Sequence, residues 1–177
     1  MPPGSTSAFT PPRPLAADDD TAAFDCGRDA LNHWFRRHAR RNQELEVSRT
    51  TVICDAEAGG IVGYVSLSTA QVERAWFPQA QQRNRPDPLP AILLGQLAVD
   101  QRWQGQGIAR SLMFYALTTA ARLSDQVGCF CVLTYPLDDD VRALHAAFGF
   151  EDLPFDPARS MAARIADLVR SGFGAPG

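Results

Sequence analysis

Three residues in the segment LAVDQRWQGQGIARS, which covers residues 97–111, have the types and spacing that bind an anion. Arg102 is followed by Gly105 and Gly107, and this turn lies between an apolar run and a segment with helical periodicity. The unpaired N–H groups at such a helix start and the positive end of the helix dipole favour a phosphate. Glycine permits close approach, and arginine adds a cation. The same glycines would suit a tight turn without a ligand, so the spacing alone leaves both interpretations open.

The elements that position this turn follow from the periodicity of the apolar residues. A strand over 91–99 enters the turn, and a helix follows it. The other expected elements are a helix over 29–42, a hairpin of strands 50–54 and 61–69, an exposed loop over 77–90, a strand over 129–134 and a helix over 139–147. This order predicts an α/β fold, with an α+β mixed sheet and at least one parallel crossover. We expect residues 1–22 to be a flexible tail and residues 23–177 to form a single domain.

Composition and charge argue against several classes of protein. The chain has 177 residues, of which 45% are hydrophobic, and this is enough for one core. Its net charge of −3 argues against a generally basic surface for nucleic acid. The sequence contains no apolar run of the roughly 20 residues that a membrane span needs, no signal-peptide pattern and no CxxC pair. We therefore expect a cytoplasmic protein without a membrane segment and without a metal site.

The residues around the glycine turn resemble the acetyl-CoA-binding core of the GNAT N-acetyltransferases. The resemblance covers residues 91–152 and rests on LAVDQRWQGQGIARSLM and on CFCVLTYPLDDDVRALHAAFGFED, which ends in the closing FGF motif. It implies a mostly antiparallel sheet with a central, splayed pair of parallel strands, flanked by helices. It also implies that Arg102, Gly105 and Gly107 hold the pyrophosphate, and that strand 129–134 splays to admit the pantetheine arm. The cofactor-binding residues that it implies are Leu97, Ala98, Val99, Arg102, Gln104, Gly105, Gln106, Gly107, Ile108, Ala109 and Phe148.

A narrower resemblance extends over most of the chain after residue 23. The segments FDCGRDALNHWFRRHARRNQ, SRTTVICD, GYVSLSTAQV and PAILLGQLAVD are similar to the acetyltransferase toxins of toxin/antitoxin modules. This resemblance implies an enzyme that acetylates the amino group of aminoacyl-tRNA and blocks translation, a ribbon-helix-helix antitoxin as partner, and a homodimer. The chain departs from the group at Gln96, where an arginine is common. Backbone N–H groups at 97–99 would still polarise the thioester carbonyl.

The residue expected to protonate the leaving thiolate also departs from the family pattern. The toxins and many GNAT enzymes have a tyrosine where this chain has His145, just ahead of AAFGF. A histidine can protonate a thiolate, since the pKa of an ordinary thiol is about 8.5. Three alternatives stay open: His145 is an ordinary helix histidine, Tyr135 is the acid instead, or the enzyme is weakened. Tyr135 would also suit the end of a strand as a core aromatic.

The helix predicted over 29–42 has two faces of different character. Its buried stripe is predicted to comprise Leu31, Trp34, Phe35 and His38. The opposite face and the proline-rich loop carry the candidate RNA-binding residues Arg36, Arg37, Arg40, Arg41, Arg83 and Arg85. An RNA backbone would be attracted to such a patch, although an ordinary solvated basic face has the same composition. The resemblance to the toxins favours RNA.

Two other functions are compatible with the same residues. A GNAT enzyme of this kind would also suit a small amine or a protein N-terminus as acceptor. Alternatively, the chain is a catalytically weak CoA-binding module that engages an antitoxin, an interpretation that the histidine at position 145 motivates. Transfer of an acetyl group to charged tRNA distinguishes the toxin from both.

Overall fold

The fold is described from a computed structural model, which describes residues 8–176. The chain forms two compact units, Met1–Ser66 with Gln96–Tyr115 and Leu67–Gly95 with Ala116–Gly177. Strands β3 (Ile61–Val72) and β4 (Leu89–Val99) and helix α4 (Ile108–Leu123) each continue from one unit into the other. The single domain that the sequence predicts over residues 23–177 stays a prediction.

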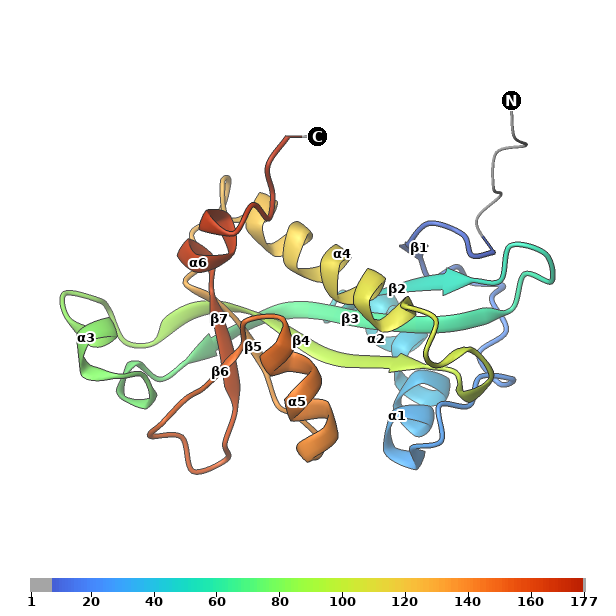
Figure 1. Cartoon of the computed structure of the whole chain (residues 1–177), viewed down its shortest axis with the longest axis horizontal. Coiled ribbons are helices and arrows are strands. Elements are labelled where there is room, and N and C mark those ends of the chain that lie inside the picture. Colours follow the sequence, from blue (N-terminus) through green and yellow to red (C-terminus); the bar gives the residue numbers. More distant parts are fainter. Residues whose placement is uncertain (1–7, 177) are drawn as a thin grey trace. The chain divides into compact units, whose positions relative to one another are not determined.

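The described strands form one seven-stranded sheet in the order β1-β2-β3-β4-β5-β7-β6 (Figure 1). The remaining strands are β1 (Arg13–Pro14), β2 (Arg49–Cys54), β5 (Cys131–Thr134), β6 (Glu151–Asp152) and β7 (Met161–Arg164). β4 and β5 are parallel, whereas β5 with β7, β6 with β7 and β1 with β2 are antiparallel. The predicted fold class, a mixed sheet with one parallel pair and flanking helices, is therefore confirmed.

Helices at 29–44, 108–123 and 139–147 occur where the apolar periodicity predicts them, whereas the short helix at 79–82 lies in the segment expected to be an exposed loop. The helices are α1 (Asp29–Trp34), the π-helical turn η1 (Phe35–Ala39), α2 (Arg40–Glu44), α3 (Gln79–Gln82), α4, α5 (Asp139–Ala147) and α6 (Ile165–Arg170), with short 3₁₀ turns η2 (Arg74–Trp76) and η3 (Gln101–Trp103). Along the part of the chain that is described, none of these helices has the length and apolar character needed to span a membrane.

An aromatic cluster fixes the first helical segment in the core of the first unit. The Phe35 and Tyr64 rings stack with centroids 4.2 Å apart, and Phe24 contacts both rings edge-on. The Tyr64 hydroxyl, fully buried, donates a hydrogen bond of 2.8 Å to the Leu31 carbonyl. These contacts bury the inner face of the helix and leave its arginines on the outer side.

The π-helical turn corrects the predicted buried stripe of this helix. Leu31 and Phe35 are buried and Trp34 is half-buried, as predicted, but His38 is exposed and Ala39 is buried in its place. A π turn contains more residues than an α turn, so it moves the next inward position from 38 to 39. A strict helical period cannot anticipate this shift.

Part of the segment expected to be a tail is ordered. Arg13 and Pro14 form the edge strand β1 by pairing with Val52 and Thr51 of β2, and Leu15 is 3% exposed. The Arg13 guanidinium also donates two hydrogen bonds to the Asp19 carboxylate, at 2.7 and 2.8 Å. Residues 8–22 thus differ from the predicted tail because they complete a sheet edge, while residues 1–7 lie outside the described residues.

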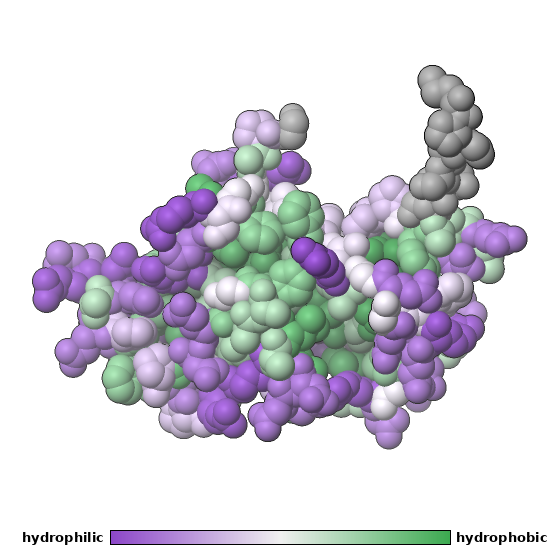
Figure 2. Space-filling model, in the orientation of Figure 1, coloured by the Kyte–Doolittle hydropathy of each residue, from purple (hydrophilic) through white to green (hydrophobic). Residues whose placement is uncertain are grey.

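The proline-rich segment of the second unit is only partly the exposed loop that the sequence predicts. It contains α3, and its outer surface is mostly hydrophilic (Figure 2). Phe77 and Leu89 are nevertheless almost fully buried, and the Phe77 ring contacts Phe130 with centroids 5.2 Å apart. The two ends of the segment are therefore anchored in the core of this unit.

Candidate active site

The predicted anion-binding turn lies in the first unit, immediately before α4. Gly105 and Gly107 have φ angles of +80° and +83°, in the left-handed region that favours glycine. A Cβ on either residue would meet no neighbouring atom within 4 Å, so conformation rather than crowding requires glycine here. The first hydrogen bond of the helix runs from the Ser111 N–H to the Gly107 carbonyl. The N–H groups of residues 108–110 come before it and point out of the helix start. The turn therefore offers backbone donors at the positive end of the helix dipole.

Asp100 holds the turn from the end of β4. Its carboxylate is 1% exposed and accepts hydrogen bonds from the N–H groups of Asp25 (3.1 Å) and Arg102 (3.0 Å) and from two guanidinium nitrogens of Arg102 (both 3.0 Å). Burial acts to raise the pKa of Asp100, but these hydrogen bonds outweigh it, and the pKa lies below its ordinary value. Arg102 itself stays 66% exposed, so Asp100 directs a cation that remains at the surface beside the turn.

Gln104 fastens the turn to two other segments. Its side-chain amide donates to the carbonyls of Cys26, at 3.2 Å, and Val99, at 3.0 Å. Gln104 was predicted to contact the cofactor, whereas in this structure its amide links the turn to the segment before α1 and to the end of β4. The sequence carried no signal for this link, because Cys26 and Gln104 are far apart along the chain.

A glycine on β3 sets the position of the α4 start. A Cβ on Gly63 would lie 2.9 Å from Ile108 Cγ2, 3.0 Å from Leu112 Cδ1 and 3.2 Å from the Ala98 carbonyl oxygen. The helix therefore packs directly against the β3 backbone. The Ile108 side chain is buried in this contact, so Ile108 presents only its backbone to a ligand at the turn.

A hollow of about 420 Å³ lies beside the turn in the first unit. Its lining includes Gln106, Gly107 and Ser111 on one side and Phe9 and residues 10–12 on the other. Ligand-binding hollows are typically about 300–1,000 Å³, so this one has the size for part of a nucleotide. Residues 9–12 were missed by the sequence analysis, which placed them in a flexible tail.

The other predicted cofactor-binding residues differ in their exposure. Ala98 and Val99 are buried, and Leu97 and Ala109 are half-buried in the first unit. Phe148 is half-buried in the second unit, where it follows α5. Their contacts with a cofactor stay predictions.

His145 is buried on α5 in the second unit, with 2% of its surface exposed. Its Nδ1 lies 2.8 Å from the Val141 carbonyl oxygen, its Nε2 lies 3.4 Å from Thr134 Oγ1, and Phe150 contacts the ring edge-on. Burial lowers the pKa of His145; the bond to Val141 acts the other way without outweighing it, and Arg142 lowers the pKa further. The Val141 carbonyl requires the proton on Nδ1, so the neutral ring presents Nε2 as an acceptor.

Tyr135 follows β5 and is 49% exposed, so it is not the core aromatic that one interpretation of the sequence predicted. Partial burial raises the pKa of its hydroxyl, and the Asp156 carboxylate adds to this. Tyr135 therefore carries its proton at neutral pH. Of the two acids considered in the sequence, Tyr135 is the one with both a proton and access to solvent.

The arginines of the helical segment fall into two pairs. Arg36 and Arg40 turn back and donate to the main-chain carbonyls of Phe24 and Asp19. Arg37 and Arg41 are exposed and have no hydrogen bond or ion pair among the described residues. Only the second pair keeps its full hydrogen-bonding capacity for a ligand.

The two loop arginines lie in the second unit. The Arg85 guanidinium donates to the Gln81 carbonyl, at 2.8 Å, and lies 4.9 Å from the centre of the Phe130 ring. Arg83 is exposed. Arg83 is therefore accessible to a ligand, like Arg37 and Arg41, whereas the Arg85 guanidinium is already bound to the Gln81 carbonyl and the Phe130 ring.

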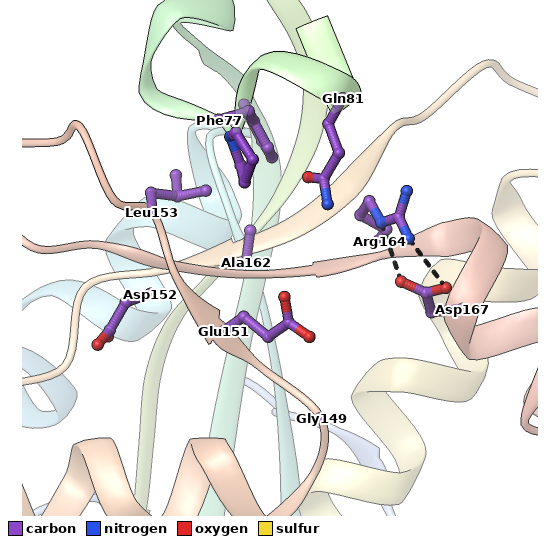
Figure 3. Close-up of a pocket in the computed structure, with 10 residues that line it drawn as sticks. Phe77, Gln81, Gly149, Glu151, Asp152, Leu153, Ala162, Arg164 and Asp167 are labelled. Carbon is purple, nitrogen blue, oxygen red and sulfur yellow. Dashed lines mark hydrogen bonds and ion pairs between the residues drawn. The ribbon is translucent and has the colours of Figure 1, made fainter.

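A second hollow, in the second unit, is lined by none of the predicted site residues (Figure 3). The Glu151 and Gln81 side chains extend toward it, and Arg164 pairs with Asp167 at its side, with a shortest N–O distance of 2.9 Å. Its volume of about 20 Å³ is room for a single water molecule. Within residues 8–176 no group of three or more His, Cys, Asp or Glu side chains is arranged to hold a metal ion.

Comparisons with known proteins agree with this geometry. Residues 47–152 match the Acetyltransferase (GNAT) domain family. A tRNA-acetylating toxin of Mycobacterium tuberculosis is 35% identical over 155 residues, covering 88% of this chain and 92% of that protein. The structure of AtaT complexed with acetyl-methionyl-tRNAfMet has a TM-score of 0.85 at 26% identity, covering 92% of this chain and 98% of AtaT. The structure of AtaTR bound with AcCoA has a TM-score of 0.80 at 26% identity, covering 93% and 98%.

Proposed function

Because this chain belongs to the GNAT family of acetyltransferases, we propose that it is a toxin that moves the acetyl group of acetyl-CoA to the amino group of an aminoacyl-tRNA. The observation that carries this proposal is the 35% identity with a tRNA-acetylating toxin over 88% of the chain. The structures of AtaT with an acetylated aminoacyl-tRNA and of AtaTR with AcCoA support the same substrates. The enzyme is an N-acetyltransferase, and acetyl-CoA is its cosubstrate.

The glycine turn is the proposed binding site for the pyrophosphate of acetyl-CoA. The N–H groups of residues 108–110 and the exposed charge of Arg102 offer donors and a cation to an anion at this place. The adjoining hollow of about 420 Å³ would receive the nucleotide end of the molecule. Asp100 and Gln104 hold the turn in shape before the ligand arrives, which reduces the cost of ordering it on binding.

The chemistry requires an acid for the leaving thiolate. The neutral amine attacks the thioester carbonyl, a C–N bond forms, the C–S bond breaks, and the amine gives up a proton to solvent. We assign protonation of the thiolate to Tyr135, because its hydroxyl carries a proton and its exposure lets it recover one from water. The buried, neutral ring of His145 presents an acceptor at Nε2 and is less suited to this step.

Arg37 and Arg41, with Arg83 on the second unit, are the proposed contacts to the tRNA backbone. All three are exposed. Contacts with phosphate would supply affinity without reading the sequence of the RNA. A ribbon-helix-helix antitoxin as partner, a homodimer and a cytoplasmic location are further proposals, which rest on the resemblance to toxin-type acetyltransferases.

A transfer assay with several acceptors tests the proposed function. The purified protein is incubated with acetyl-labelled acetyl-CoA and, separately, charged tRNA, uncharged tRNA, small amines and peptides with free N-termini. Label on charged tRNA and not on uncharged tRNA is expected. Label on small amines or peptides alone would replace the tRNA proposal with the second enzymatic alternative. Binding of acetyl-CoA without transfer to any acceptor would favour the CoA-binding module.

A further inference from the structure

The pairing of β4 with β5 ends well before β4 does. The parallel register runs from Ala91 with Cys131 to Leu93 with Leu133, whereas β4 itself continues to Val99. At the next position the Thr134 hydroxyl donates a hydrogen bond of 3.1 Å to the Leu94 carbonyl. Because Leu94 and Thr134 are 1% and 3% exposed, water cannot easily satisfy that carbonyl. A side-chain donor thus takes the place of the next strand-to-strand bond.

His145 is the neighbour that holds this threonine. Its Nε2 lies 3.4 Å from Thr134 Oγ1, and its other nitrogen is fixed on the Val141 carbonyl within α5. The single proton of the Thr134 hydroxyl is therefore shared between Leu94 O, at 3.1 Å, and His145 Nε2, at 3.4 Å, in a three-centre hydrogen bond that holds the side chain between them. The arrangement links α5 to the point where the two strands part.

We propose that His145 is a positioning residue, which through Thr134 fixes the Leu94 carbonyl and so sets the point where β4 and β5 separate to admit the thioester arm of acetyl-CoA. The inference rests on the proposed function for the identity of the ligand. It assigns no proton transfer to His145. A glutamine side chain would serve in its place, because its amide oxygen can accept from Thr134 but the amide is not an acid at neutral pH.

The test compares acetyl-CoA dissociation constants of variants at two positions. His145→Phe and Thr134→Val each remove one partner of a buried hydrogen bond and should weaken binding about tenfold. His145→Gln and Thr134→Ser keep the required group and should stay within about threefold of the wild-type constant. In the double variant His145→Phe/Thr134→Val the loss should be well short of the product of the single losses, because both act on one network.

Turnover against pH separates positioning from acid catalysis. For a positioning residue, the ratio of wild-type to His145→Gln kcat should be constant between pH 6 and 8.5. An acid role would make this ratio change about tenfold per pH unit above the pKa of the histidine, and would leave Gln and Phe equally impaired. That result, or multiplicative losses in the double variant, would overturn the proposal. The dissociation constants are measured with acetyl-CoA alone, without a substrate that accepts the acetyl group. They therefore test the proposal even if charged tRNA is not the substrate.

Discussion

The Asp100 carboxylate accepts four hydrogen bonds at the proposed cofactor site. We predict that Asp100→Asn weakens acetyl-CoA binding about tenfold and lowers the free energy of unfolding by about 2 kcal/mol, because the charge-assisted bonds to Arg102 are lost. Calorimetric titration and urea unfolding measure the two effects. Asp125→Asn, at an exposed position just after α4, is the control and should change neither quantity. An Asp100→Asn protein with unchanged affinity would contradict the role given to this carboxylate.

The lowered pKa of His145 should make the stability of the protein depend on pH. Its pKa is lowered in the folded state and about 6.5 in the unfolded chain, so between these values the unfolded chain binds more protons. Stability should therefore be highest above about pH 7 and should fall as the pH drops through 6.5 toward the folded pKa. Urea unfolding at pH 7.5 and 5.5 should show a smaller fall for His145→Gln than for the wild type. An identical fall in both proteins would show that His145 is not the group responsible.

The sequence predicted the residues of the turn better than it predicted their partners. The glycines at 105 and 107 are recognisable because their spacing follows a strand and precedes a helix. The partners of Asp100 and Gln104 are not, since Asp25 and Cys26 lie some 75 residues earlier and no local pattern marks such a contact. The buried state of His145 was equally hidden, because helical periodicity says little about one polar residue on a short helix.

The helical segment formed by η1 and α2 carries two pairs of arginines, and one pair can serve as the control for the other. Arg37→Gln/Arg41→Gln should raise KM for charged tRNA at least several-fold without a change in stability, since both side chains are exposed. Because each phosphate contact contributes about 0.7–0.9 to the salt slope, the slope of log affinity against log salt should become shallower by about 1.5. Arg36→Gln/Arg40→Gln, which breaks bonds to the main chain, should mainly lower stability. Equal effects of the two pairs on KM would argue against an RNA contact by Arg37 and Arg41.

The contact between β3 and α4 gives a second prediction for the elements. Gly63→Ala should cost about 1–3 kcal/mol of stability and displace the start of α4, because the added Cβ meets Ile108, Leu112 and the β4 backbone. Acetyl-CoA affinity should fall together with stability, and calorimetric titration measures it. Gly60→Ala, where a Cβ has open space, is the control. A Gly63→Ala protein with normal stability and affinity would show that the helix accommodates the methyl group freely.

The elements also mark where periodicity fails as a guide to structure. The strands at 49–54, 61–72 and 89–99 were predicted to within a few residues because they are long and apolar. The π turn moved a buried position from 38 to 39, and the anchoring of Phe77 and Leu89 turned part of an expected exposed loop into core. Both depend on tertiary packing, which overrides local preference.

For the whole molecule, the composition and the order of the elements predicted the mixed sheet and its parallel pair. The family match covers residues 47–152, which belong to both compact units. The edge strand formed by Arg13 and Pro14 was not predicted, because a short proline-rich segment has no strand pattern until a sheet edge is there to receive it. Residues 9–12, which directly precede this strand, also line the hollow beside the glycine turn.

Acetylation of the amino acid carried by tRNA can be detected directly on the product. Total charged tRNA is incubated with acetyl-CoA and the protein, digested to nucleosides, and examined by mass spectrometry for N-acetylated aminoacyl-adenosine. Gly107→Val should abolish the product, whereas Gly59→Val, which has a similar φ of +79° in the β2–β3 turn, should preserve it. A new product, 42 mass units heavier than its aminoacyl-adenosine because an acetyl group replaces a hydrogen, is expected only with an intact glycine turn. An unmodified aminoacyl-adenosine, in the presence of a protein that binds acetyl-CoA, would show that this enzyme does not acetylate charged tRNA.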